Sequence, residues 1–156
     1  MRSLADRIEH YLKKRLEASS ERLIEIQRSE IAEIFACVPS QISYVLATRF
    51  GPEQGYLVES RRGGGGYLRI IKLELEENQL IADLLEGISN RLVSQEEGES
   101  LINLLEEEGF LTKREGLLMR AVIDRNYLPV ELPQRDLVRA GILRAMLYAI
   151  SRKEFR

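Results

Sequence analysis

Two adjacent arginines followed by a run of glycines form the most informative stretch of the sequence. Arg61 and Arg62 precede four glycines, Gly63, Gly64, Gly65 and Gly66. A glycine run loses much backbone entropy on ordering and buries no side chain, so folding alone gives no reason for it. It suits a place where backbone must approach another molecule closely, and the arginines can bind phosphates or enter a narrow minor groove. A flexible loop is the simpler interpretation of such a run, and the neighbouring elements decide between the two.

A second set of residues suited to DNA lies earlier in the chain. Its members are neutral groups that hydrogen-bond, where an ordinary surface helix carries Glu and Lys: Ser40, Gln41, Ser43, Tyr44 and Thr48. Such groups match the base edges in the major groove, and Arg28 and Arg49 are candidates for backbone phosphates. For Ser40 or Tyr44 alone, a helix start or a packing role is the simpler explanation. The complete set favours DNA contact.

The second set falls on a helix predicted from Pro39 to Arg49, because proline fixes φ at a value suited to the first helical turn. A short helix capped by Ser29 is expected before it, with residues 36–38 as the turn between the two. The inward stripe of the second helix is aliphatic: Ile42, Val45 and Leu46. Two short helices joined by a tight turn predict a helix-turn-helix.

The elements around this pair complete the arrangement. Ser3 can cap an amphipathic helix to about Ala18, and residues 22–27 look like a short strand. Residues 55–60 and 67–72 are rich in aromatic and β-branched side chains, so they predict a hairpin with the glycines at its tip. The order helix, strand, helix, turn, helix, hairpin is that of a winged helix-turn-helix domain, with residues 1–73 as its extent.

Charge and composition limit the other classes. Residues 1–72 hold 12 Lys and Arg against 9 Asp and Glu, whereas residues 73–156 hold 11 against 16, so only the first half is suited to a polyanion. One cysteine, Cys37, and one histidine, His10, exclude a disulfide framework or a His/Cys metal cluster within one chain. With no apolar run of membrane-spanning length, a cytoplasmic protein without metal or cofactor is expected.

The acidic part, residues 74–156, predicts an all-α domain of four helices. Apolar spacing marks a first helix that reaches Leu92, and Ser94 and Thr112 each begin a capping box for the next two. The second of these helices is expected to end at Gly109, and Leu137 belongs to the apolar stripe of the last one. Such a small domain buries limited surface, so dimerisation through its helices is favoured over a monomeric bundle. The fold class is therefore α+β.

The sequence resembles the CtsR repressors of class III stress genes, and the resemblance covers the whole chain. The resemblance rests on residues 29–33, 37–45 and 48–50 and on the arginine-glycine stretch 61–67. It implies a dimeric bacterial repressor of heat-shock genes, including Clp protease and chaperone genes, released by heat or stress. The operator would be a tandem direct repeat, with the recognition helix in the major groove and the wing in the minor groove. The resemblance also implies an arginine kinase and the Clp protease machinery as partners, with Arg62 as the modified residue.

Two other classes of function remain to be weighed. A phosphate-binding loop of an enzyme requires Gly-Lys-Ser or Gly-Lys-Thr before a helix, whereas Gly66 is followed by Tyr67 and a strand-like run. No other arrangement of residues points to catalysis, so an enzyme is not expected. The remaining alternative is a winged-helix module that contacts proteins, such as an adaptor for a chaperone or protease, without sequence-specific DNA binding.

Overall fold

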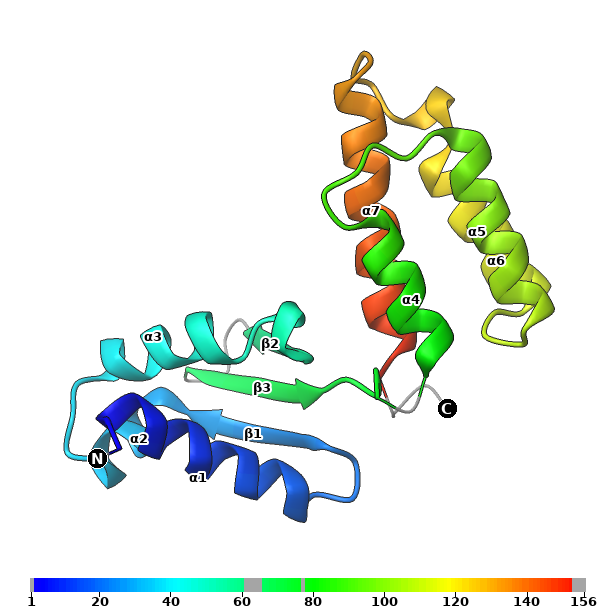
Figure 1. Cartoon of the computed structure of the whole chain (residues 1–156). Coiled ribbons are helices and arrows are strands. Elements are labelled where there is room, and N and C mark those ends of the chain that lie inside the picture. The colour runs from blue at the N-terminus through cyan, green and yellow to red at the C-terminus, as the bar shows by residue number, and fades with distance from the viewer. Residues whose placement is uncertain (1, 61–65, 77, 153–156) are drawn as a thin grey trace. The chain divides into compact units, whose positions relative to one another are not determined.

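The computed structural model describes residues 2–60, 66–76 and 78–152 of the chain. It divides into a first unit that extends to Glu74 and a second unit, Leu75–Ser151. Unit 1 contains three helices and a three-stranded sheet, and unit 2 is helical (Figure 1). The fold is α+β. The elements are α1 (Leu4–Ala18), β1 (Leu23–Gln27), α2 (Arg28–Ile34), α3 (Pro39–Arg49), a 3₁₀ turn (Pro52–Gln54), β2 (Tyr56–Ser60), β3 (Tyr67–Lys72), α4 (Gln79–Ile88), α5 (Gln95–Glu107), α6 (Lys113–Ile123), a second 3₁₀ turn (Arg125–Tyr127) and α7 (Gln134–Ile150).

Helix α1 begins as the sequence predicts. The Ser3 hydroxyl accepts a hydrogen bond from the Asp6 amide, and the Asp6 carboxylate accepts one from the Ser3 amide, both at 3.1 Å. This reciprocal pair satisfies two backbone donors that have no partner inside the helix. One stripe of α1 is fully buried in the core of unit 1: Ile8, Leu12 and Leu16.

The sheet of unit 1 has the order β1-β3-β2 with antiparallel neighbours. The predicted hairpin is confirmed, since β2 pairs with β3 from Tyr56 opposite Lys72 to Ser60 opposite Leu68. The hairpin is the wing, and residues 61–65 of its tip lie outside the described residues. Gly66 has φ +85°, a left-handed conformation that favours glycine where the chain enters β3.

Helices α2 and α3 form the helix-turn-helix, with one correction to the predicted start of α2. Ser29 does not cap this helix: α2 begins at Arg28 directly after β1, with Gln27 at the cap position and no side-chain capping bond. In the turn, Ala36 adopts φ 51°, and the Cys37 amide donates to the Ala32 carbonyl at 2.9 Å. Pro39 is the first residue of α3, as predicted.

In unit 2, two capping boxes start α5 and α6 where the sequence places them. The side chains of Ser94 and Thr112 each accept a hydrogen bond from the amide three residues later, at 3.1 Å in both helices. Helix α5 is followed by Gly109 in the left-handed conformation, φ 81°, which ends the helix as predicted. Four α-helices span the described part of unit 2, and α4 lies beside α7 in Figure 1, as α5 does beside α6.

Two apolar residues of unit 2 lie elsewhere than predicted. Helix α4 ends at Ile88, so Leu92 follows it in an exposed loop and Val93 is the buried residue instead. Leu137 is exposed on α7 rather than part of its inward stripe. The core of unit 2 is built from residues that include Ile81, Ile102 and Leu143.

One charged residue lies at the centre of unit 2. The Arg139 side chain on α7 is buried, and its Nε donates to the Ile123 carbonyl at 2.8 Å. Its Nη1 donates to the Val93 carbonyl at 3.0 Å and to the Asp136 carboxylate at 2.6 Å. A single guanidinium therefore ties the end of α6 and the segment before α5 to α7.

Candidate nucleic-acid interface

Helix α3 presents the neutral polar set on its exposed face. Ser40, Gln41, Ser43, Tyr44 and Thr48 are all exposed, whereas Ile42, Val45 and Leu46 are buried in the core of unit 1. The buried stripe holds the helix against α1 and α2 and so determines which side faces outward. A row of neutral donors and acceptors on one rigid helix can read base edges in a major groove.

One member of this set already uses its donor. The Thr48 hydroxyl donates to the Tyr44 carbonyl of the preceding turn at 2.8 Å. Such a bond occupies the single hydroxyl hydrogen and leaves the oxygen lone pairs and the methyl group exposed. Within this conformation Thr48 can accept a hydrogen bond from a base or contact an apolar group, and it cannot donate.

Arg49, at the end of α3, is held by two carboxylates of α1. Its Nη1 lies 2.8 Å from Asp6 Oδ1 and 2.6 Å from Glu9 Oε1. The hydrogen bond from Arg49 is the largest cause of the lowered pKa of Asp6, which is about 2. The pKa of Glu9 is also lowered, first by the hydrogen bond from Lys13 and next by that from Arg49. The pKa of Arg49 is raised in turn by the hydrogen bond to Asp6.

This ion pair persists over the physiological pH range. Because the folded-state pKa of Asp6 is depressed, the pair contributes stability at neutral pH and loses it only as the pH falls below the ordinary carboxyl range toward 2. Sequence reasoning assigned Arg49 to phosphate and missed the two carboxylates, whose partner is 40 or more residues away. Nη1 donates both bonds, so the bonds to Asp6 and Glu9 do not use the donors of Nη2 and Nε.

The other arginines of unit 1 differ in their partners. Arg28 is the first residue of α2, and within the described part of the chain its buried Nε has no hydrogen-bond partner. Arg69 on β3 pairs with Glu25 of β1 at 3.0 Å, so the sheet neutralises it. The structure does not describe five of the residues that the sequence assigns to DNA: Arg61, Arg62, Gly63, Gly64 and Gly65. The described chain resumes at Gly66, and the exposed Tyr67 begins β3, the second strand of the wing.

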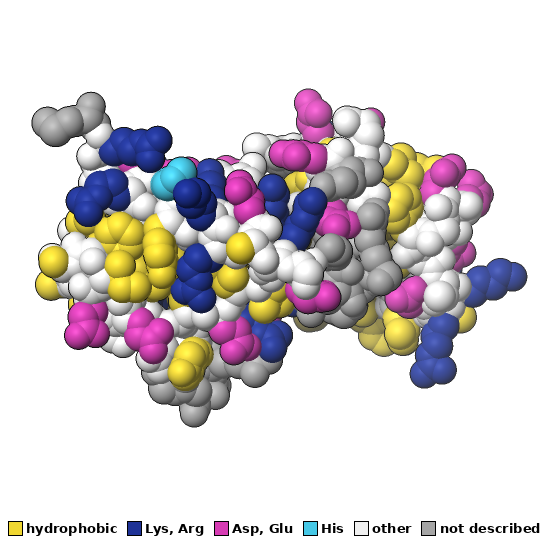
Figure 2. Space-filling model, turned by 90° about the horizontal axis from the view of Figure 1, so that it is seen from below, with side chains coloured by type: hydrophobic (Ala, Val, Ile, Leu, Met, Phe, Trp, Pro, Cys, Tyr) yellow, Lys and Arg dark blue, Asp and Glu magenta, His cyan; other side chains and the backbone are white. Residues whose placement is uncertain are grey.

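The face of unit 1 that includes α1 carries mixed charge. Figure 2 shows Lys and Arg side chains around the histidine, with acidic side chains nearby. A shallow depression of about 330 Å³ is lined there by Arg2, Asp6, Glu9, His10 and Lys13. Lys13 bonds to Glu9 at 2.6 Å, so the acidic residues of α1 pair with its cations. This face is less suited to a polyanion than the uncharged face of α3.

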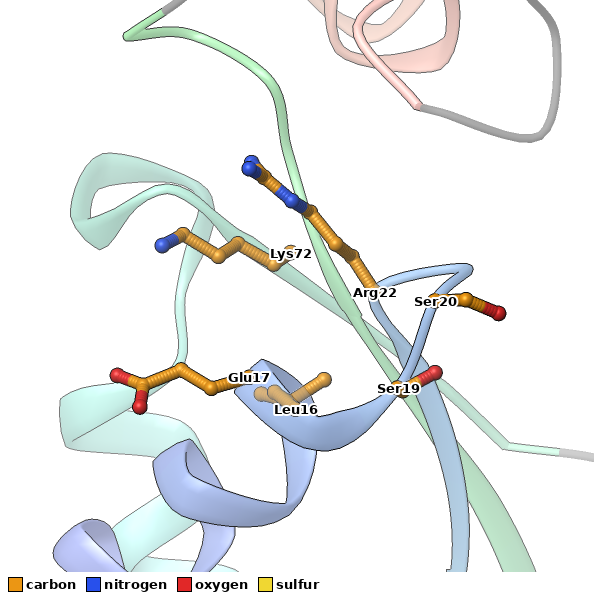
Figure 3. A pocket seen from close by; sticks show the side chains of 6 residues that line it. All are labelled: Leu16, Glu17, Ser19, Ser20, Arg22 and Lys72. Atoms are coloured by element: carbon orange, nitrogen blue, oxygen red, sulfur yellow. The ribbon is translucent and has the colours of Figure 1, made fainter.

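A second cavity of about 290 Å³ lies at the end of the sheet remote from the wing tip. Figure 3 shows Arg22 and Lys72 on one side of it and Glu17 on another. Arg22 precedes β1 and Lys72 ends β3, whereas the wing end of these strands is where Gln27 pairs with Tyr67. The cavity therefore does not belong to the face formed by α3 and the wing.

The described residues contain neither a candidate metal site nor a single helix suited to cross a membrane. No group of three or more His, Cys, Asp or Glu residues among them could hold a metal ion. Nor does any single helix in these ranges have the length and apolar character to cross a membrane; α2 and α3 together pass that test but are bent by 104° where they meet.

Comparison with known proteins extends over nearly the whole chain. Residues 3–74 match the model of the CtsR N-terminal HTH domain, and residues 76–148 match that of the CtsR C-terminal dimerization domain. The transcriptional regulator CtsR of Geobacillus stearothermophilus is 50% identical over 154 residues, which cover 98% of this chain and all of that protein. The CtsR of Bacillus subtilis (strain 168) is 43% identical over 151 residues, or 97% of this chain and 98% of that protein.

A solved structure is also similar along its length. The crystal structure of CtsR in complex with a 26-base-pair DNA duplex has 49% sequence identity and a TM-score of 0.50, covering 96% of this chain and 99% of that one. The winged helix-turn-helix of unit 1 and the helical unit 2 thus correspond to the two domains that these models describe. The chain belongs to the CtsR family of transcriptional regulators.

Proposed function

We propose that the chain is a sequence-specific DNA-binding transcriptional repressor that acts as a homodimer. The observation that carries this proposal is the exposed face of α3, where Ser40, Gln41 and Ser43 offer neutral donors and acceptors on a helix fixed by its buried stripe. Membership of a family of transcriptional regulators supports it, as does the related CtsR solved with a DNA duplex. Unit 2 matches a dimerization domain, and two winged domains together give the avidity that a repressor needs.

The wing completes the proposed interface. Arg61 and Arg62 enter the minor groove beside the major groove that α3 occupies, and Gly63 to Gly66 allow the backbone to approach closely. The operator is a tandem repeat upstream of heat-shock genes, including those of the Clp protease. This part of the proposal rests on the resemblance of the arginine-glycine stretch to CtsR repressors.

Release from the operator is proposed to occur at the wing. An arginine kinase that modifies Arg62 adds negative charge where the minor groove is itself negative, so attraction becomes repulsion. Heat acts at the same place because a glycine run has no side chains to pack and gains much backbone entropy when it leaves DNA. Clp-dependent degradation then removes the free repressor.

The proposal is tested by selecting tight binders from a randomised duplex pool at physiological salt. Enrichment of a tandem repeat with A·T-rich flanks is the expected result. Failure to enrich any sequence would contradict sequence-specific binding and favour a winged module that contacts proteins. The selected operator then serves as the ligand for each variant described below.

Arg49 is proposed to contact a backbone phosphate while Asp6 and Glu9 hold its Nη1. Replacing Arg49 by glutamine is expected to weaken operator binding and make the slope of log K against log salt concentration shallower by about 0.9 per subunit, since one phosphate contact is lost. Binding isotherms at several salt concentrations measure this slope. Arg91→Gln, an equal charge change at an exposed residue in the loop after α4 of unit 2, is the control and should leave the slope unchanged. A weaker complex with an unchanged slope would show that Arg49 only positions α3 against α1.

Dimerisation is proposed to use the exposed apolar face of α6. Three aliphatic residues on one side of this helix are exposed: Leu117, Leu118 and Val122. Met119 and Ile123 of the same helix are buried in the core of unit 2. Exposed aliphatic residues grouped on one helix face are typical of a surface that another molecule covers. The match of unit 2 to a dimerization domain supports a second copy of the chain as that molecule.

Leu118→Glu is therefore expected to raise the dimer dissociation constant by at least about 100-fold, because burying each leucine contributes about 1.5–3 kcal/mol and two copies are lost. Leu118 is 61% exposed, so the monomer should fold normally. Sedimentation over a range of protein concentrations measures the effect. Leu92→Glu is the matched control, at a residue that is 49% exposed in the loop after α4. Equal dimer affinity for Leu118→Glu and the native chain would place the interface elsewhere.

A further inference from the structure

The residue just before helix α3 is exposed and apolar, and the fold does not explain it. Val38 occupies the N-cap position with φ −82° and ψ 151°, and its side chain makes no capping hydrogen bond. Valine is among the least favourable residues at this position, where Ser, Thr, Asp or Asn stabilise a helix. The side chain is 59% exposed, so the core gains little from it.

The neighbours of Val38 already provide the packing that a helix start needs. Cys37, one residue before, is partly buried against the core, and Ile42 is fully buried. These two residues stand before the cap and at the fourth helical position, where a hydrophobic pair commonly fixes the entry of the chain. Pro39 supplies the favourable first helical residue. Neither packing nor helix propensity therefore requires an apolar side chain at residue 38.

The position of Val38 corresponds to the part of a recognition helix that meets bases. In helix-turn-helix proteins the N-terminal residues of the second helix contact the base edges. Exposed Ser40 and Gln41 follow Val38 after Pro39 and supply hydrogen-bonding groups at the same end of α3. The apolar group that a major groove displays is the C5-methyl of thymine.

From this position, exposure and chemistry we propose that Val38 is a specificity-determining residue that packs against the 5-methyl group of a thymine in each half of the operator. The proposal rests on the DNA-binding function proposed above. It assigns a base preference to an aliphatic residue at the N-terminal end of α3, where Ser40 and Gln41 offer hydrogen-bonding groups and no methyl group. Arg and amide side chains select guanine and adenine, whereas thymine is distinguished by its methyl group.

Val38→Ser separates this role from a structural one. Serine at the N-cap accepts a hydrogen bond from the first turn, so the variant should unfold at a temperature equal to or above that of the native protein. Its operator affinity is nevertheless expected to fall, because the apolar contact is lost. A purely structural role would move stability and affinity in the same direction.

The contact itself is tested with operator duplexes in which one thymine at a time is replaced by deoxyuridine, which lacks the methyl group. At one thymine of each half-site the native protein should lose about four-fold in affinity, the equivalent of one buried methyl group. Val38→Ser should show no loss at that thymine. Ile34→Ser is the matched control, because Ile34 is a 57% exposed β-branched residue at the end of α2 and should leave the thymine dependence intact.

The outcomes distinguish the two proposals. Suppose that the native protein binds the operator with all its thymines and that no deoxyuridine substitution lowers its affinity. The role proposed for Val38 is then wrong, and the DNA-binding function stands. The same conclusion follows if Val38→Ser keeps the full thymine dependence of the native protein. If the native protein binds no operator, both proposals fail.

Discussion

Arg139→Ala is expected to destabilise unit 2 by about 3–5 kcal/mol, the range found when a buried charged group loses its partner. The native guanidinium satisfies the carbonyls of Ile123 and Val93 and pairs with Asp136. Both carbonyls belong to buried residues, and each buried acceptor left without a donor costs about 1–3 kcal/mol. The lost side-chain volume adds a cavity beside the core of unit 2.

Two variants identify the cause of this loss. Arg139→Lys keeps the positive charge but presents a point charge in place of a planar fork, so it cannot reproduce all three bonds and should fall between alanine and arginine. Arg144→Ala lies on the same helix, partly exposed, and should stay within about 0.5 kcal/mol of the native protein. Urea unfolding followed by circular dichroism measures the change, and amide exchange assigns it to residues 75–151. A loss below about 1 kcal/mol for Arg139→Ala would contradict this role.

The prediction also bears on function, because unit 2 carries the proposed dimer surface. If α6 is no longer held at Ile123, its exposed residues Leu117 and Leu118 lose the rigid helix that presents them. Operator affinity should then fall through loss of the dimer, although unit 1 is unchanged. A monomeric protein with an intact unit 1 is the expected product.

Local signals explain which elements the sequence predicted well. The capping boxes at Ser94 and Thr112 and the hairpin before Gly66 depend on residues within a few positions of one another. Such patterns specify hydrogen bonds between residues that are close in the sequence, so local sequence is sufficient to predict them. The same locality explains the error at Ser29: β1 runs directly into α2, so the helix starts one residue before the residue that would have capped it.

Residues whose surroundings come from distant segments could not be predicted in the same way. Arg139 reads as a surface position because charged residues are rarely buried, and its acceptors are 16 and 46 residues away. The choice between Leu92 and Val93 for the core depends on where α4 ends, and Val93 is fixed by its bond to Asp136 on α7. For α3, periodicity was sufficient to place the polar face, but the carboxylate partners of Arg49 come from α1.

Arg62→Glu is expected to produce the largest loss of operator binding. One arginine contact in a groove contributes about 1–3 kcal/mol, and a dimer carries two wings, so the variant should lose about 2–6 kcal/mol in binding free energy. Reversing the charge adds repulsion from the narrow minor groove, whose negative potential is enhanced at A·T-rich sequence. The change leaves unit 2 and the polar face of α3 untouched, so folding and dimerisation should remain as in the native chain.

The specific role of Arg62 is distinguished from general charge by comparing three variants on the selected operator and on random duplex. Arg62→Lys retains attraction to the groove and should lose less than Arg62→Glu, whereas Arg22→Glu places the same charge reversal at the end of the sheet remote from the wing. If net charge alone governed binding, Arg22→Glu and Arg62→Glu would weaken both duplexes equally. Selective loss of operator preference in Arg62→Glu instead shows that the wing reads the shape of the site. A phosphate placed on Arg62 by a kinase would then act as the glutamate does, with the larger negative charge of a phosphate group. Unchanged operator affinity in Arg62→Glu would remove both the wing contact and its control by modification.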